Sequence, residues 1–189
     1  MAASIRALRV SVTGFSRLLD AARAGEGWAF EELFRTWSGP VTGFVRARGA
    51  VDVAGIVNDV FLRAFGALHS FEGDEAGFRA WLFAIARNRV IDEFRTEARR
   101  PVTIDLDSAT VAVAAGDVVE DAERHLGDER VLRLLETLTE DQREVLTLRF
   151  VADLTVDQIA EVTGRRRGAV KQLQRRALRR LESVLEADG

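Results

Sequence analysis

Apolar residues recur at three- and four-residue spacing along most of the chain, and alternating runs are few. A period near 3.6 is typical of amphipathic α-helices, whereas half-buried β-strands alternate with a period of two. The pattern therefore predicts an all-α protein. The helices are expected at residues 16–24, 28–47, 53–68, 75–97, 128–137, 140–151, 155–162 and 167–186.

Two prolines punctuate this pattern. Proline lacks a backbone N–H and its ring clashes with the preceding turn, so it kinks or ends helices. We expect Pro40 to kink or interrupt the second helix and Pro101 to end the fourth.

The helical period disappears across residues 101–127, where small, β-branched and acidic residues dominate. We expect a flexible acidic linker there, and the apolar positions of 102–114 leave open a short packed strand. The linker divides the chain into an N-terminal helical domain at 16–100 and a C-terminal one at 128–187. Residues 1–15 form an N-terminal extension, expected to be disordered or to fold on a partner.

The 27 basic and 30 acidic residues nearly cancel, but they are unevenly distributed. The net charge is +3 over residues 79–100, −7 over 101–140 and +8 over 165–180. Clustered arginine is typical of surfaces that bind nucleic acid. A solvated helix face is the alternative interpretation of any single cluster. The charge distribution nevertheless favours a nucleic-acid-binding protein.

The inventory of reactive residues argues against an enzyme. The chain has no cysteine and only two histidines, so it has no thiolate nucleophile and no histidine cluster for a metal. We therefore expect no catalytic residues, no metal and no cofactor. No run approaches the ~18 apolar residues of a membrane span, and two arginines interrupt the N-terminal stretch where a signal peptide would lie. A cytoplasmic protein is expected.

Residues 139–181 have the pattern of a helix-turn-helix. Thr139 and Thr155 each precede a glutamine by three residues, which fits the capping box at a helix start, and Gly164 supplies the turn. The following helix has an apolar stripe and a cationic face, as a major-groove recognition helix requires. A protein-docking module is the alternative. The expected DNA contacts are Arg165, Arg166, Arg167, Lys171, Gln172, Arg175, Arg176 and Arg179.

Two N-terminal helices also have exposed polar faces. On the helix at 75–97, Trp81, Asn88 and arginines share a face that suits single-stranded or opened DNA, because aromatic rings stack on unpaired bases. Alternatively, Trp81 is a core residue and Asp92 pairs locally with an arginine. The helix at 53–68 leaves four polar residues to solvent or a partner. These are Asp52, Asn58, Asp59 and Arg63.

Five segments follow one another in the order of a known family. They are AFEELFRTWSGPVTGFV, VNDVFLRAFGALHSF, FRAWLFAIARNRVIDEFR, LTEDQREVLTLRF and LTVDQIAEVTGRRRGAVKQLQRRALRRL. At these spacings the chain resembles an extracytoplasmic-function (ECF) sigma factor, the compact two-domain class of bacterial RNA polymerase sigma subunits. The resemblance runs from about Leu18 to Leu185.

The resemblance implies a sigma region 2 domain and a sigma region 4 domain joined by the linker. Region 2 would bind the clamp of the largest polymerase subunit and open the minus-ten element. Region 4 would recognise the minus-thirty-five element. Further implied partners are the flap of the second-largest subunit and an anti-sigma factor, with no membrane insertion. A stand-alone helix-turn-helix regulator is the alternative, and it would bind specific DNA without polymerase.

Site residues follow from the resemblance. Asp52, Asn58, Asp59 and Arg63 would dock on the clamp, with Asn58 and Asp59 standing where the family usually has Gln-Glu. Base capture at the minus-ten element would offset the cost of unstacking. The residues implied for this element and for melting are Phe71, Phe78, Trp81, Asn88, Asp92, Arg95, Arg99 and Arg100.

The chain departs from the family pattern at three places. Gly55 lies inside the clamp helix, where glycine costs roughly 1 kcal/mol, and the acid usual near that point is missing. Arg165 to Arg167 stand where the family usually has a small residue that caps the helix. The helix cap is lost there, and affinity for phosphate is gained. Residues 1–15 have no counterpart in the family core.

Overall fold

A computed structural model of the protein describes residues 12–98 and 129–187, and none of these lies in a β-strand. The all-α prediction is confirmed, whereas the linker predicted at 101–127 lies outside the described residues. Residues 129–136 are helical. The other helices are α1 (Val12–Arg23), α2 (Gly27–Ala47), α3 (Val53–Ala67), the short 3₁₀ helix η1 (Leu68–Ser70), α4 (Glu75–Glu97), α6 (Glu140–Phe150), α7 (Val156–Thr163) and α8 (Arg167–Ala187).

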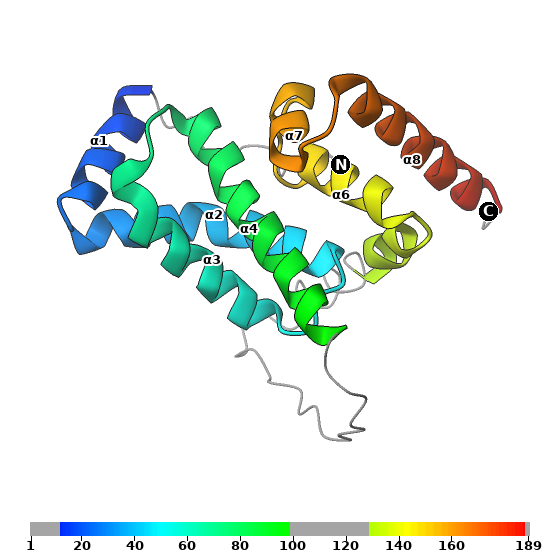
Figure 1. The fold of residues 1–189 in the computed structure, drawn as a ribbon, viewed down its shortest axis with the longest axis horizontal. Helices are drawn as coiled ribbons and strands as arrows, with labels where there is room; N and C mark the ends of the chain where they lie inside the picture. The colour runs from blue at the N-terminus through cyan, green and yellow to red at the C-terminus, as the bar shows by residue number, and fades with distance from the viewer. Residues whose placement is uncertain (1–11, 99–128, 188–189) are drawn as a thin grey trace, which may run out of the picture.

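The helices form two groups, α1 to α4 and α6 to α8, as Figure 1 shows. In the first group α3 packs against α2 and α4, and α1 packs against α2. The apolar stripe predicted for α4 is confirmed, because Leu82, Phe83, Ala86 and Val90 are buried in the core. Phe94, predicted on the same stripe, is only half-buried.

Helix α2 continues through Pro40 without an interruption, which was one of the two outcomes predicted there; a kink stays a prediction. Proline removes one backbone hydrogen bond from a helix, at a cost of about 3 kcal/mol. Buried side chains on both sides of the proline, including Trp37, Val41 and Phe44, hold the helix against the core. Tertiary packing therefore outweighs the local penalty.

Helix α1 begins at Val12, within the predicted N-terminal extension. Phe15 is buried, and its ring centroid lies 5.5 Å from that of Phe78 in the core. Residues 12–15 therefore belong to the N-terminal domain, which starts earlier than the predicted boundary at 16. The rest of the predicted extension, residues 1–11, lies outside the described residues.

The helix boundaries of the C-terminal group agree with the capping chemistry. Thr139 and Thr155 each accept a hydrogen bond from the backbone N–H three residues later, and the glutamine there completes both capping boxes. Gly164 ends α7 in the left-handed conformation, with φ of +68°. The sequence-based placement of these two helix starts and of the turn is therefore confirmed.

Asp52 caps the N-terminus of α3, because its Oδ1 accepts a hydrogen bond of 2.9 Å from the Gly55 backbone N–H. A Cβ at position 55 would overlap the Asp52 carboxylate. The glycine thus permits the close approach of the cap, which explains its presence inside a helix.

Replacing Asp52 by alanine is expected to destabilise the fold by about 1 kcal/mol, because the cap is lost. Replacing Gly55 alone should change stability little, because the gain in helix propensity of about 1 kcal/mol offsets the displaced cap. In the Asp52→Ala background, Gly55→Ala should instead stabilise by about 1 kcal/mol. Urea unfolding of the four proteins measures this coupling, and strictly additive effects would contradict it.

Candidate nucleic-acid interface

Helix α8 presents a cationic face to solvent. Val170 and Ala177 are buried beneath the helix, and Leu173 and Leu181 are half-buried beside them. The opposite face is polar and follows the tight turn at Gly164, an arrangement that a major-groove helix requires. Its exposed residues include Arg166, Arg167, Lys171, Gln172, Arg175, Arg176 and Arg179.

Arg165 is set apart from this face. Its Nη1 lies 3.3 Å from Asp141 Oδ2, and its Nη2 lies 3.7 Å from Glu144 Oε2. Its side chain is only 28% exposed. The predicted phosphate contact of Arg165 would compete with these acids. Arg167 also has an acidic partner, Asp157, but both of these side chains are mostly exposed.

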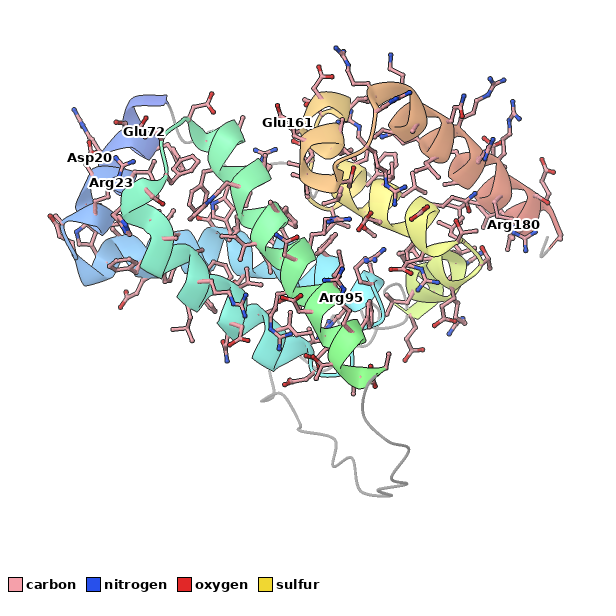
Figure 2. The ribbon with its side chains drawn as sticks, in the orientation of Figure 1. Asp20, Arg23, Glu72, Arg95, Glu161 and Arg180 are labelled. Atoms are coloured by element: carbon pink, nitrogen blue, oxygen red, sulfur yellow. The ribbon has the colours of Figure 1, made fainter. Side chains whose placement is uncertain are left out.

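The exposed face of α4 contains Asn88, Asp92 and Arg95, and Trp81 is half-buried at its N-terminal end. The Nη1 of Arg95 lies 3.9 Å from Asp92 Oδ1, so the local pair that was an alternative prediction is present. Figure 2 shows Arg95 near the C-terminal end of α4. Arg99 and Arg100 lie outside the described residues.

An aromatic cluster lies beneath the Trp81 end of this face. The Trp81 ring centroid is 5.2 Å from that of Phe71 and 5.6 Å from that of Phe78. Phe71 is buried and Phe78 has no exposed surface. In this conformation the two phenylalanines support Trp81 from the core, and a direct contact between Phe78 and DNA is sterically blocked.

On α3, Asn58 and Arg63 are exposed as predicted, whereas Asp59 has a partner within the chain. The Arg89 Nε donates a hydrogen bond of 2.8 Å to Asp59 Oδ2. This bond raises the pKa of Arg89 above its ordinary value, and it links α3 to α4. Asp59 therefore has a contact within the domain, and a polymerase contact would compete with it.

Leu62 is 70% exposed on the same side of α3 and was missed by the sequence analysis. Its position could have been found, because Leu62 falls outside the inward stripe of the helix. An exposed leucine among polar residues is typical of a site where a protein partner packs.

The described ranges contain no helix that is long and apolar enough to cross a membrane. Within the same ranges, no group of three or more histidine, aspartate or glutamate residues is arranged to hold a metal ion.

The chain matches two protein families, Sigma-70 region 2 over residues 33–100 and Sigma-70, region 4 over residues 134–182. It is 35% identical over 177 residues to the ECF RNA polymerase sigma factor BldN of Streptomyces coelicolor, covering 91% of this chain and 66% of BldN. It is 33% identical over 159 residues to the ECF RNA polymerase sigma factor RpoE of Cereibacter sphaeroides, covering 81% of this chain and 84% of RpoE.

Among solved structures, CnrH in complex with the cytosolic domain of CnrY is similar, with a TM-score of 0.67 and 27% identity. The similarity covers 93% of this chain and 99% of CnrH. The two family matches occur in the order region 2 and then region 4, and the two relatives are both ECF sigma factors. The chain therefore belongs to the ECF RNA polymerase sigma factors, the specificity subunits that direct bacterial RNA polymerase to promoters.

Proposed function

We propose that each of the two groups of helices recognises a different promoter element. A region 2 domain, residues 12–100, binds core polymerase and opens the minus-ten element, and a region 4 domain, residues 128–187, recognises the minus-thirty-five element. The family matches at 33–100 and 134–182 support this division. The cationic face of α8, which follows a capped turn, is the observation that supports it most strongly.

The region 4 domain recognises DNA through α8. Arginine, lysine and glutamine form bidentate contacts with base edges in the major groove, and the surplus arginines neutralise phosphates. The first three turns of α8 provide most of these groups, as recognition helices use their N-terminal residues for base contacts. The proposed contacts are Arg166, Arg167, Lys171, Gln172, Arg175, Arg176 and Arg179.

The region 2 domain captures an unpaired base on α4. Trp81 provides the stacking surface, supported from below by Phe71 and Phe78. Asn88 offers an amide to a base edge, and Arg95 binds an adjacent phosphate after leaving Asp92. Arg99 and Arg100, which follow in the sequence, are proposed to bind further phosphates.

The exposed side of α3 docks on the polymerase clamp. Asn58 and Arg63 provide polar contacts, and Leu62 provides the apolar centre that such an interface requires. The region 4 domain contacts the flap of the second-largest subunit. The protein acts in the bacterial cytoplasm, on the nucleoid, and has no catalytic residues of its own. The solved complex of CnrH with the cytosolic domain of CnrY supports a further protein partner, and an anti-sigma factor is the partner proposed here.

A reconstituted transcription assay tests the proposal. The purified chain is added to core polymerase on pooled genomic fragments, and new transcripts are expected only when both are present. Leu62→Glu should abolish this activity. Glu182→Gln, an exposed position near the C-terminal end of α8 and outside the proposed contacts, is the control. A chain that binds specific DNA alone and never stimulates core polymerase would be a stand-alone regulator, and the proposal would be wrong.

A further inference from the structure

The two domains pack against each other in this structure. Helix α4 contacts α7, and α2 contacts α6. Val145, Leu148 and Ile159 of the C-terminal domain belong to the same buried apolar cluster as the N-terminal core. The packing therefore excludes water, and it brings together ionic groups from both domains.

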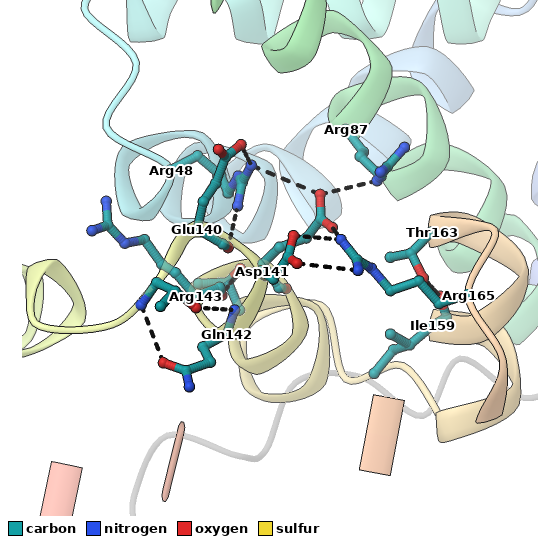
Figure 3. Close-up of polar contacts among 12 residues, drawn as sticks. Arg48, Arg87, Glu140, Asp141, Gln142, Arg143, Ile159, Thr163 and Arg165 are labelled. Atoms are coloured by element: carbon teal, nitrogen blue, oxygen red, sulfur yellow. Dashed lines mark hydrogen bonds and ion pairs between the residues drawn. The ribbon is translucent and has the colours of Figure 1, made fainter. Parts of the chain in front are cut away.

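Glu144 of α6 lies at the centre of this interface and is 2% exposed. Its Oε1 accepts a hydrogen bond of 3.0 Å from Arg87 Nε and lies 3.8 Å from Arg48 Nη2. Its Oε2 lies 3.7 Å from Nη2 of Arg165 in the turn before α8. Figure 3 shows these three arginines, which come from the C-terminal end of α2, from α4 and from the turn before α8. The buried Glu144 carboxylate thus contacts arginines of the N-terminal domain and Arg165 in the turn before α8.

Arg48 is buried and has a second acidic partner. It donates hydrogen bonds of 3.0 Å to the Glu140 carbonyl and 2.8 Å to the Glu140 carboxylate. A buried arginine that loses its partners and stays out of water is strongly destabilising. When the domains separate, Arg48 must therefore be rehydrated or bound by another anion.

A further ionic contact joins α4 to the turn between α6 and α7. The Arg79 Nη1 lies 2.6 Å from Asp153 Oδ2 and 3.3 Å from the Asp153 carbonyl. Asp153 has a φ of +50° and is the one non-glycine residue with positive φ in the described ranges. Nearby, the Gln158 side-chain amide donates a hydrogen bond of 3.0 Å to the Ala76 carbonyl.

In the ion pairs that cross between the two domains, the N-terminal domain provides the positive charges and the C-terminal domain provides the negative charges. Interfaces that separate during function are more polar than permanent ones, which resemble a domain core. The ionic part of this interface therefore favours a contact that opens, whereas its apolar part is packed like a domain core.

The closed packing conflicts with the proposed DNA contacts. Helix α7 borders the Trp81 side of α4 across a hollow of about 330 Å³, lined by Trp81, Ala84, Gln158, Glu161 and Val162. A DNA strand stacked on Trp81 would bring phosphates near the Glu161 carboxylate, which repels them. Moreover, the two promoter elements lie 25 positions apart, about 85 Å at ~3.4 Å per base pair. Domains that touch cannot reach both.

We infer that the ionic interface centred on Glu144 is an internal latch, which holds the free protein closed and separates when polymerase and promoter are bound. That the closed form blocks DNA contacts rests on the proposed function, whereas the contact between the two domains in the free protein does not. Because Arg165 shares Glu144 with Arg48 and Arg87, the latch also engages a residue of the DNA-binding turn.

Energy transfer between two dyes on the full chain tests the latch without polymerase or DNA. The natural chain has no cysteine, so Val51→Cys and Glu136→Cys, both exposed, place one dye on each side of the interface. Unaltered closed molecules should give high transfer. Glu144→Gln removes the central charge with little change in shape and should raise the open-to-closed ratio about tenfold or more.

Arg87→Gln breaks the same contact from the other domain and should have a similar effect, so a folding defect of one variant cannot explain both. Glu182→Gln, which removes an exposed charge on α8, should leave the ratio unchanged. The series is measured up to 1 M salt, with circular dichroism to verify folding. High transfer retained by both variants at every salt concentration, or low transfer in the unaltered chain, would overturn the latch and leave the transcription assay unaffected.

Discussion

Replacing Phe78 by alanine is expected to destabilise the N-terminal domain by about 3–5 kcal/mol, as for other buried phenylalanines. The side chain has no exposed surface. Its ring centroid lies between 5.5 and 6.1 Å from the ring centroids of Phe15, Trp37, Phe71 and Trp81. Because these aromatic side chains are rigid, they cannot fill the cavity that truncation leaves. Urea unfolding monitored by circular dichroism measures the loss.

Two further substitutions distinguish a residue that packs beneath the DNA-binding surface, Phe78, from one proposed to contact DNA, Trp81. Phe78→Leu keeps the site apolar and most of its volume, so it should cost less than the alanine variant and leave promoter opening intact. Trp81→Ala, at a half-buried position, should instead reduce opening strongly, because the stacking surface is lost. Permanganate reactivity of thymines in the minus-ten element measures opening. Loss of opening in a stably folded Phe78→Leu protein would show a direct role for Phe78 and contradict the assignment.

The helices could be predicted because their determinants are local. The apolar period of α4 and the capping boxes at Thr139 and Thr155 depend on residues at most a few positions apart. A kink or an interruption was expected at Pro40, and the interruption is absent because a local rule takes no account of the core packed against α2. The early start of α1 likewise depends on a contact between Phe15 and the distant Phe78.

The faces of the candidate site were predicted in outline, but the partners of individual residues were not. A helical wheel assigns Asn88 and Arg176 to exposed faces, and the structure agrees. The same wheel leaves Arg165 free, although it pairs with Asp141, 24 residues away. Asp59 pairs with Arg89, 30 residues away. Such ion pairs depend on tertiary packing, which the charge sequence alone does not specify.

Replacing Arg176 by alanine is expected to weaken promoter use by about 1–3 kcal/mol in a sequence-dependent manner. The side chain is exposed on α8, two turns beyond its first residue, and lies on the side away from the buried Val170 and Ala177. A bidentate contact with a base edge provides discrimination of this size, whereas a phosphate contact weakens binding to all sequences equally. Initial transcription rates on promoters with single changes in the minus-thirty-five element measure the effect.

Arg180→Ala is the matched control, because it removes the same charge from the same helix one turn later. The Arg180 Nε lies 3.5 Å from the Thr137 carbonyl, so this side chain is directed towards the helix that precedes α6 and not towards DNA. Its loss should reduce the general attraction to phosphates as much as Arg176→Ala does, without changing the preference among promoters. The difference between the two variants therefore isolates the base contact. Equal losses on every promoter would show that Arg176 binds the backbone only and that the recognition face of α8 lies elsewhere.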